Sequence, residues 1–373
     1  MERYLAELIQ RDLRRKFVLL SGPRQVGKTT LARGLYERHE YRNYDVPDQR
    51  VGIVARTWNR QADLVVLDEL HKMRKWKSYL KGIYDAEGVS TPILVTGSAR
   101  LDLARKMGDS LAGRYFSFRL HPLTLKELKG HGHRDEMFDR LLSQGGFPEP
   151  FFTEEEYFYP RWQRSHLDII LRQDLLDLEQ VRQIVGIETL VELLRQRVGS
   201  PVSYQSLAED LQVDQTTVKR WIAILENLFV IFKITPWHRN VARSLLKAPK
   251  YYFYDNGQVI GDAGIKLENL VAAALLREVH FEEDARGRRM KLHYLRNKDG
   301  EEVDFAVSES GRVTLMIEVK WDDATPSRHF RTLCPRGTKA PAVQAVGTLR
   351  TVNRPAPDLR LVPAAEWLEG LTL

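Results

Sequence analysis

A glycine-rich stretch near the N-terminus has the residue types and spacing of a phosphate-binding loop. Residues 22–29 follow the pattern G-x-x-x-x-G-K-T, whose glycines let the backbone curl until its amide groups point at phosphate oxygens. In this pattern Lys28 can reach the β- and γ-phosphates, and the Thr29 hydroxyl can ligate Mg²⁺. We therefore expect ATP and Mg²⁺ to bind here. The residues expected to surround the nucleotide are Gly22, Pro23, Arg24, Gln25, Val26, Gly27, Lys28, Thr29 and Thr30.

The segments on either side of this loop are the elements that must position it. The apolar run 17–20 is typical of a buried strand, and residues 30–36 can begin a helix whose positive N-terminal end faces the phosphates. Residues 1–16 have the pattern of an amphipathic helix, which we expect to pack against this domain. A strand, a glycine-rich loop and a helix in this order predict a parallel α/β sheet.

Two acidic residues end a second apolar run. Residues 64–67 are apolar, as in a buried parallel strand, and Asp68 and Glu69 follow directly. Asp68 can hold Mg²⁺ through its water shell, and Glu69 can polarise the water that attacks the γ-phosphate. The alternative is a core strand that ends in solvated acids.

Further polar groups could act on the same nucleotide. The strand-like run 92–100 places Thr96 and Ser98 at its carboxyl end, where parallel sheets carry functional groups, so either could sense the γ-phosphate or merely cap the strand. Arg114 could serve as an arginine finger, in cis or from a neighbouring subunit of a homo-oligomer. A plain surface arginine is equally compatible with the pattern. The side chains predicted to act in hydrolysis are Lys28, Glu69, Ser98 and Arg114.

Residues 199–254 have the pattern of a winged helix-turn-helix. Ser203 and Asp214 can cap two successive helices, and the apolar runs 229–234 and 250–254 can pair as a wing. In such a module the second helix enters the major groove of DNA. A winged helix that only packs against the nucleotide domain is the alternative. The side chains expected to face DNA are Gln215, Thr216, Lys219 and Arg220.

The last third of the chain carries a second chemical pattern. Asp304 lies on one expected strand, and Glu318-x-Lys320 lies on the next, as in metal-dependent nucleases. The strand period places Glu318 and Lys320 on one face, so the two acids could hold a second Mg²⁺ while Lys320 orients or deprotonates the attacking water. Glu268, on a preceding helix, could complete the acidic cluster. The alternatives are a solvated strand edge, or a nuclease fold that binds without cutting.

Composition limits the class of protein. The chain has 373 residues, 43% of them hydrophobic and 29% charged, which predicts two or three domains. No run of about 18 apolar residues predicts a membrane span, and the N-terminus lacks a signal-peptide core. The single cysteine, Cys334, excludes an intrachain disulfide and favours a reducing, cytoplasmic compartment. A net charge of +7 is compatible with nucleic-acid binding but does not demonstrate it.

The order of these motifs resembles the prokaryotic AAA+-type P-loop ATPases that carry a nuclease-like C-terminal domain of uncharacterised function. The resemblance covers almost the whole chain, and it implies the fold and ATP binding without settling a physiological role. The stretches that carry it are residues 22–29, 67–72, 96–100, 110–114, 121–124, 145–149 and 252–255.

Taken together, these patterns predict an α/β protein of four parts. We expect a P-loop NTPase (AAA+-like) parallel-sheet domain over 1–125, a helical lid or connector over 126–198, a winged helix over 199–254 and a nuclease-like (restriction-endonuclease-like) α/β domain over 255–373. The preferred hypothesis is an ATPase that couples its nucleotide state to DNA binding or processing. The alternatives are a nucleotide-dependent switch or scaffold that binds a protein partner without cleavage, and a transcriptional regulator.

Overall fold

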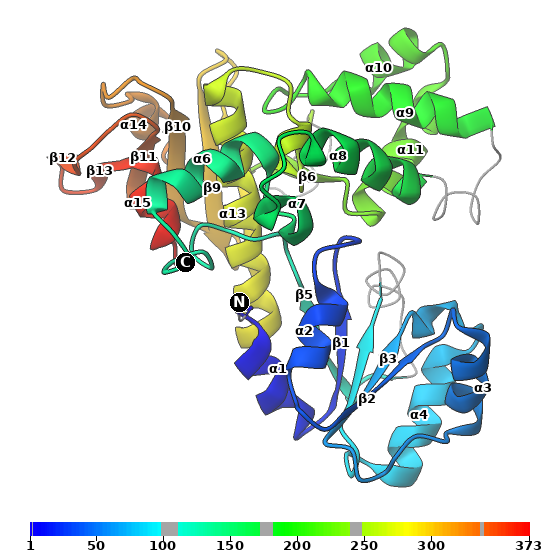
Figure 1. Cartoon of the computed structure of the whole chain (residues 1–373). Coiled ribbons are helices and arrows are strands. Elements are labelled where there is room, and N and C mark those ends of the chain that lie inside the picture. The colour runs from blue at the N-terminus through cyan, green and yellow to red at the C-terminus, as the bar shows by residue number, and fades with distance from the viewer. Residues whose placement is uncertain (2, 98–110, 172–181, 239–247, 336–338) are drawn as a thin grey trace. The chain divides into compact units, whose positions relative to one another are not determined.

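The computed structural model describes residues 1, 3–97, 111–171, 182–238, 248–335 and 339–373 (Figure 1). The chain divides into two compact units. Unit 1 comprises residues 1–121 with 227–229, and unit 2 comprises residues 122–226 with 230–373. In these ranges no helix combines the length and the apolar character that a membrane crossing needs.

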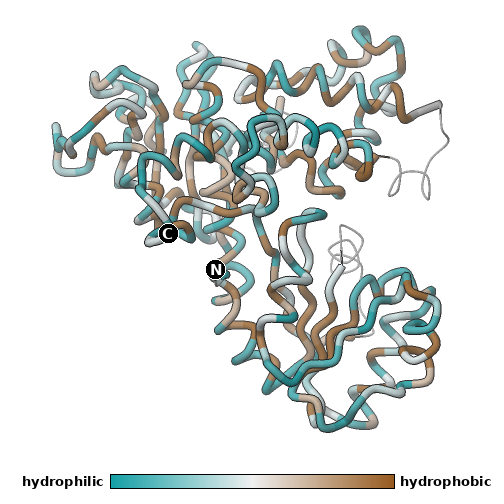
Figure 2. The backbone as a smooth tube through the Cα atoms, in the orientation of Figure 1, coloured by the Kyte–Doolittle hydropathy of each residue, from teal (hydrophilic) through white to brown (hydrophobic). Residues whose placement is uncertain are grey.

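The described strands of unit 1 form one parallel sheet in the order β2-β3-β4-β1-β5. The three inner strands are buried along their whole length, as expected for a parallel sheet covered on both faces, and they are the hydrophobic strands of this unit in Figure 2. The strands are β1 (Phe17–Ser21), β2 (His39–Asn43), β3 (Leu64–Asp68), β4 (Ile93–Thr96) and β5 (Tyr115–Arg119).

The helices of unit 1 cover this sheet with their apolar sides. In the first of them Ile9 and Leu13 are fully buried, which confirms the predicted amphipathic helix. A second core, around Trp76 and Leu80, joins the fourth helix to the inner strands. The helices are α1 (Ala6–Leu13), α2 (Lys28–Gly34), α3 (Pro47–Ala55), the short 3-10 helix η1 (Leu70–Lys72) and α4 (Trp76–Glu87).

The strand register of unit 1 brings the predicted nucleotide-site residues to one edge of the sheet. Thr96 of β4 is the register partner of Asp68 on β3 and of Leu20 on β1, one residue before that strand ends. Because all three strands run parallel, the loop after β1, the acids after β3 and the tip of β4 lie together at the carboxyl edge.

Unit 2 begins with a helical region that leads to the predicted helix-turn-helix. Its two capped helices form as predicted. Ser203 accepts a hydrogen bond from the Ser206 amide (3.4 Å), and Asp214 accepts one from the Thr217 amide (2.9 Å). The helices are α6 (Arg134–Gln144), α7 (Pro148–Phe152), α8 (Phe158–Ile169), α9 (Arg182–Arg195), α10 (Tyr204–Leu211) and α11 (Gln215–Asn227).

The strand pair predicted as a wing belongs to a larger sheet. β6 (Ile231–Pro236) and β7 (Lys250–Phe253) pair antiparallel as predicted, but β6 also pairs in parallel with the strand that contains His293. The pair thereby joins a described sheet of order β12-β13-β11-β10-β9-β8-β6-β7. The reason is burial: every residue of β7 is buried, whereas a wing that lies against DNA is solvated on one face before binding.

The remaining elements of unit 2 surround this sheet. A long helix packs against β8 and β10 and is the yellow helix of Figure 1. The elements are η3 (Asn256–Gln258), α13 (Ala263–Arg286), β8 (Met290–Arg296), β9 (Glu302–Glu309), β10 (Arg312–Lys320), α14 (His329–Leu333), β11 (Ala342–Val346), β12 (Asn353–Ala356), β13 (Leu359–Pro363) and α15 (Ala364–Glu369).

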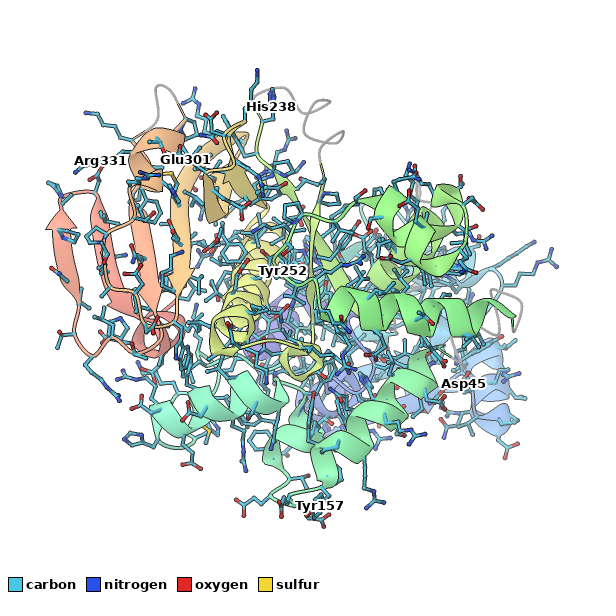
Figure 3. All side chains as sticks on the ribbon, turned by 90° about the horizontal axis from the view of Figure 1, so that it is seen from above. Asp45, Tyr157, His238, Tyr252, Glu301 and Arg331 are labelled. Atoms are coloured by element: carbon cyan, nitrogen blue, oxygen red, sulfur yellow. The ribbon has the colours of Figure 1, made fainter. Side chains whose placement is uncertain are left out.

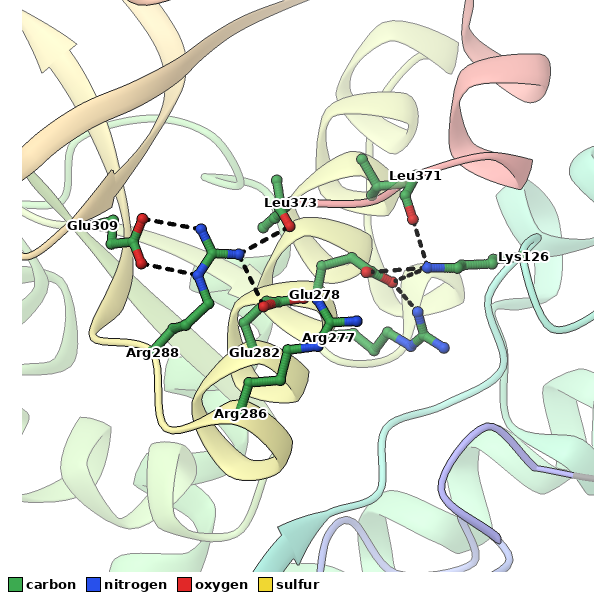
Figure 4. A network of polar contacts seen from close by, with 9 residues as sticks. All are labelled: Lys126, Arg277, Glu278, Glu282, Arg286, Arg288, Glu309, Leu371 and Leu373. Atoms are coloured by element: carbon green, nitrogen blue, oxygen red, sulfur yellow. Dashed lines mark hydrogen bonds and ion pairs between the residues drawn. The ribbon is translucent and has the colours of Figure 1, made fainter. Parts of the chain in front are cut away.

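Two buried glutamates of α13 are neutralised by cations from other elements (Figure 4). Lys126 Nζ lies 3.2 Å from both carboxylate oxygens of Glu278. Arg288 donates to Glu282 (2.9 Å) and bonds Glu309 with two nitrogens (2.8 and 2.9 Å). Since an unpaired buried carboxylate costs several kcal/mol, this network fixes α13 against its neighbours.

Asp255 is a buried carboxylate where the end of β7 meets the helical region. The Tyr159 hydroxyl of α8 donates to it (3.0 Å), as does the Gly257 amide (3.3 Å), and Arg195 of α9 faces it. Burial raises the pKa of Asp255 to about 7, against the lowering effect of these contacts. The folded state therefore holds this proton to a higher pH than the unfolded chain does.

This difference predicts a pH-dependent stability. Proton binding by Asp255 favours the folded state, so its contribution is complete below about pH 4 and is lost as the pH rises through about 7. Between pH 5 and pH 7 we expect the free energy of unfolding of the wild type to fall by on the order of 2 kcal/mol relative to Asp255→Asn. Urea unfolding at several pH values measures this. Asp358→Asn, at an exposed position, should follow the wild-type curve, and parallel curves for Asp255→Asn would contradict the assignment.

Candidate functional site

The phosphate loop has a backbone that only glycine accommodates at its two ends. Gly22 has φ +152° and Gly27 has φ +94°. A Cβ atom on Gly22 would lie 2.3 Å from the carbonyl oxygen of Leu120, so the loop approaches the chain after β5 more closely than any side chain allows. The loop therefore leaves β1 with the sharp curvature that the sequence pattern predicts.

Lys28 lies inside the loop. Its side chain is almost fully buried (8% exposed), and Nζ donates to the carbonyl oxygens of Gly22 (3.0 Å) and Pro23 (2.6 Å). A buried ammonium needs such partners, because its desolvation is costly. The loop thus holds a positive charge at the position where the sequence pattern expects phosphate oxygens.

Asp68 joins three hydroxyl groups at the carboxyl edge of the sheet. One carboxylate oxygen, Oδ2, accepts from Thr29 (3.0 Å) and from Tyr41 (2.6 Å), while Oδ1 accepts from Thr96. The predicted pair of Mg²⁺ groups, Thr29 and Asp68, is therefore in direct contact. A hydroxyl and a carboxylate are the hard oxygen donors that Mg²⁺ prefers, so these residues fit the ion.

Tyr41 was not predicted as part of this site. It lies on β2, next to β3, and the guanidinium of Arg33 lies 3.9 Å from the centroid of its ring. Residues 41–45 are typical of a short strand with a polar end, but nothing in the sequence indicates which neighbour the tyrosine hydroxyl meets. Thr96, one of the two predicted γ-phosphate sensors, forms its hydrogen bond with Asp68.

Glu69 follows β3 with a left-handed backbone (φ 55°). Burial raises the pKa of its carboxyl, and the charge of Asp68 raises it further, while Lys72 and Lys28 act in the opposite direction. Within the described residues its buried Oε2 accepts no hydrogen bond, although Lys72 Nζ lies 3.5 Å and His71 Nε2 lies 3.6 Å away. A carboxylate at the end of β3, next to Asp68, suits the predicted role of polarising a water.

Arg114 lies at the opposite edge of the sheet. Its carbonyl oxygen accepts from the amide of Phe17, the first residue of β1, and its guanidinium donates to Asp85 on α4 (2.8 Å). Because the phosphate loop follows the last residue of β1, Arg114 is separated from it by a strand of roughly 16 Å. An arginine finger in cis is therefore wrong, and its supply by a neighbouring subunit stays a prediction. Ser98 lies outside the described residues.

The four residues predicted to face DNA begin α11. Thr216, Lys219 and Arg220 are exposed, whereas Gln215 is half-buried and its amide donates to Gln205 on α10. The opposite face of the helix packs inward and contributes Val218, Trp221 and Ile222 to the core. The helix thus presents a basic, hydrogen-bonding face to solvent.

The acids and the lysine of the second predicted site lie on neighbouring strands. Glu318 is almost fully buried (3% exposed), and Lys320 Nζ lies 3.1 Å from its Oε1. Asp304 on β9 accepts from the Val319 amide (2.8 Å). Burial and the nearby charges of Glu268 and Glu318 raise the pKa of Asp304 to about 8. Glu318 and Lys320 share a face, as the strand period predicts.

A second lysine, which sequence reasoning missed, lies among these acids. Lys250 of β7 forms an ion pair with Glu302, and its Nζ lies 3.6 Å from Glu268 Oε1. The Tyr252 hydroxyl donates to the same oxygen of Glu268 (2.7 Å). The ranges that the structure describes contain no group of three acidic, histidine or cysteine side chains arranged to hold a metal ion. The second Mg²⁺ site, with Asp304, Glu318 and Glu268 as ligands, does not fit this arrangement.

Comparison with known proteins finds family models that match three parts of the chain. Residues 14–129 match the family model of the AAA domain. Residues 135–266 match a domain of unknown function (DUF8612), and residues 263–367 match another (DUF4143).

Similar proteins come from other prokaryotes. An uncharacterised protein of Mycobacterium tuberculosis is 28% identical over 305 residues, which cover 79% of this chain and 68% of that protein. An uncharacterised protein of Haemophilus influenzae is 24% identical over 360 residues and covers 86% of each chain.

Two solved structures show only a weak likeness. A Thermotoga maritima RuvB variant has a TM-score of 0.32 at 17% identity, over 61% of this chain and 88% of its own. A DNA replication initiation factor has a TM-score of 0.30 at 18% identity, over 60% of this chain and 85% of its own. Likenesses of this strength indicate no function. Residues 14–129 thus resemble the AAA domain, and residues 135–266 and 263–367 match families to which no function is assigned.

Proposed function

We propose that unit 1 binds ATP with Mg²⁺ and hydrolyses it. The observation that carries this proposal is the hydrogen bond between Thr29 and Asp68 at the phosphate loop (3.0 Å), which unites the two expected Mg²⁺ groups at one point. The match of residues 14–129 to the AAA domain supports the same reading.

Each group of the site then has a role. Bound Mg²⁺ supplies charge neutralisation at the β- and γ-phosphates. Thr29 and Asp68 would provide oxygen donors to that ion. The ammonium of Lys28 would leave the two loop carbonyls and contact phosphate oxygens instead. Glu69 orients the attacking water and accepts its proton at the carboxylate.

We further propose that the nucleotide state controls DNA binding by unit 2, through the exposed face of α11. The exposed Lys219 and Arg220 and the net charge of +7 support contact with phosphates. Cleavage of DNA is not part of the proposal, because the acidic cluster that would perform it does not fit a metal ion. Two alternatives would use the same ATPase unit: a switch that binds a protein partner, and a sequence-selective regulator. The DNA-binding measurement below distinguishes both of them from this proposal.

The first of two predictions on this function concerns the water-activating group. Glu69→Gln should lower the rate of ATP hydrolysis by about 100-fold or more, since a general base typically contributes that much, while ATP binding persists. Lys28→Ala should weaken ATP binding itself. Phosphate release and the fluorescence of a labelled ATP analogue measure the two effects. Glu87 lies at the end of α4, and its carboxylate pairs with Arg60. Glu87→Gln is therefore the matched control and should keep the wild-type rate. Wild-type hydrolysis in Glu69→Gln would sink the assignment.

The second prediction concerns DNA. Lys219→Ala with Arg220→Ala should weaken duplex binding by about tenfold and reduce the steepness of its salt dependence, because two phosphate contacts and their released counterions are lost. Anisotropy of labelled DNA at several salt concentrations, with ADP or a non-hydrolysable ATP analogue, measures this. Arg350→Ala with Arg354→Ala, at two exposed arginines, controls for the change in net charge.

Three outcomes would redirect the DNA proposal. Undetectable binding by the wild type at low salt would favour the protein-partner switch. Equal binding by both double variants would remove α11 from the interface. Strong preference for one sequence, abolished in Lys219→Ala with Arg220→Ala, would favour the regulator.

A further inference from the structure

We propose that Lys250 is the resident cation of the acidic cluster formed by Glu268, Glu302, Asp304 and Glu318, and that its ammonium group occupies the place of a metal ion beside Glu268. The inference concerns unit 2 alone and does not depend on ATP hydrolysis by unit 1.

The first support is the environment of the lysine itself. Lys250 is 1% exposed, which is rare for lysine unless its charge is paired. Its Nζ contacts Glu302, lies 3.6 Å from Glu268 Oε1 and lies 5.3 Å from the centroid of the Tyr294 ring. Two carboxylates and the face of an aromatic ring are the surroundings that stabilise a buried ammonium.

The second support is the confinement of Glu268. The Tyr252 hydroxyl donates to Oε1 (2.7 Å), and Tyr252 lies beside α13 in the interior of unit 2 (Figure 3). Gly199 also packs so closely that a Cβ there would lie 2.7 and 2.8 Å from the two carboxylate oxygens. Glu268 therefore has little room to turn away from Lys250 and toward another ligand.

Charge and chemistry then decide against a divalent ion at this position. An ammonium group has three donors and no lone pair, so it satisfies carboxylates but cannot ligate a metal ion. A divalent cation next to it would be repelled by a positive charge at close range in a poorly solvated region. Lys320 in turn pairs with Glu318 (3.1 Å), so acids of α13, β9 and β10 are paired with two lysines.

Removal of the ammonium should create the metal site. Lys250→Met keeps the apolar length of the side chain and leaves Glu268, Glu302 and Asp304 without their cation. We expect this variant to bind Mn²⁺ at least tenfold more tightly than the wild type, by calorimetry and by electron paramagnetic resonance without nucleotide. Addition of Glu268→Gln to Lys250→Met should abolish the gain. Lys233→Met, on the adjacent strand β6, is the matched control and should bind Mn²⁺ like the wild type.

A second variant keeps the inference testable if Lys250→Met fails to fold. Glu268→Gln in the otherwise native chain should leave the Mn²⁺ dissociation constant within about twofold of wild type, because Glu268 is not a metal ligand while Lys250 is present. A tenfold loss of Mn²⁺ affinity in Glu268→Gln would overturn the inference. It would equally be overturned by a folded Lys250→Met variant that binds Mn²⁺ no better than the wild type.

Discussion

The Asp68 carboxylate is the point on which the organisation of unit 1 depends. It accepts hydrogen bonds from Thr29, which follows the phosphate loop, from Tyr41 on β2 and from Thr96 on β4. These contacts can form only if the parallel strands β2, β3 and β4 end at the same level. The hydrogen bonds of this one side chain therefore depend on the register of those three strands. The hydrophobic inner strands supply the stability, and the carboxylate sets where their polar ends meet. The position of Glu69 follows as well, since it is the next residue and its amide is bonded to Thr96.

Much of this arrangement could be predicted from sequence, because it depends on local patterns. Glycine spacing predicts the loop, an apolar run that ends in acids predicts β3, and helix caps such as Ser203 and Asp214 predict where helices begin. The contacts that were missed are those between strands distant in sequence. Tyr41 and Lys250 carry no motif, and only the strand order reveals that they meet Asp68 and Glu268. Arg114 shows the same limit, because its position in a motif does not reveal the edge of the sheet at which it lies.

The strand pair β6–β7 illustrates how burial overrides a local pattern. Two apolar runs after a helix-turn-helix have the sequence of a wing, and they do pair as predicted. Yet a pair that is apolar on both faces stabilises the fold most when both faces are covered, so it joins the larger sheet through β8. One consequence is that Lys250, near the start of β7, is brought to acids of β9 and α13.

The hydrogen bonds of Lys28 to the loop affect how tightly the proposed site would bind a nucleotide. Two loop carbonyl oxygens accept from its ammonium, so they take the place of phosphate oxygens as its hydrogen-bond acceptors and hold the lysine against the loop. Hydrogen bonds to a charged group contribute about 1.5–3 kcal/mol each. The contacts of a phosphate with Lys28 would therefore add to the binding free energy only by the amount by which they exceed these two bonds. If the proposed ATPase releases a phosphate from this position, the same carbonyls would again accept from Lys28, so its ammonium would not remain without partners. The carbonyl contacts would thus weaken nucleotide binding and favour the release of product.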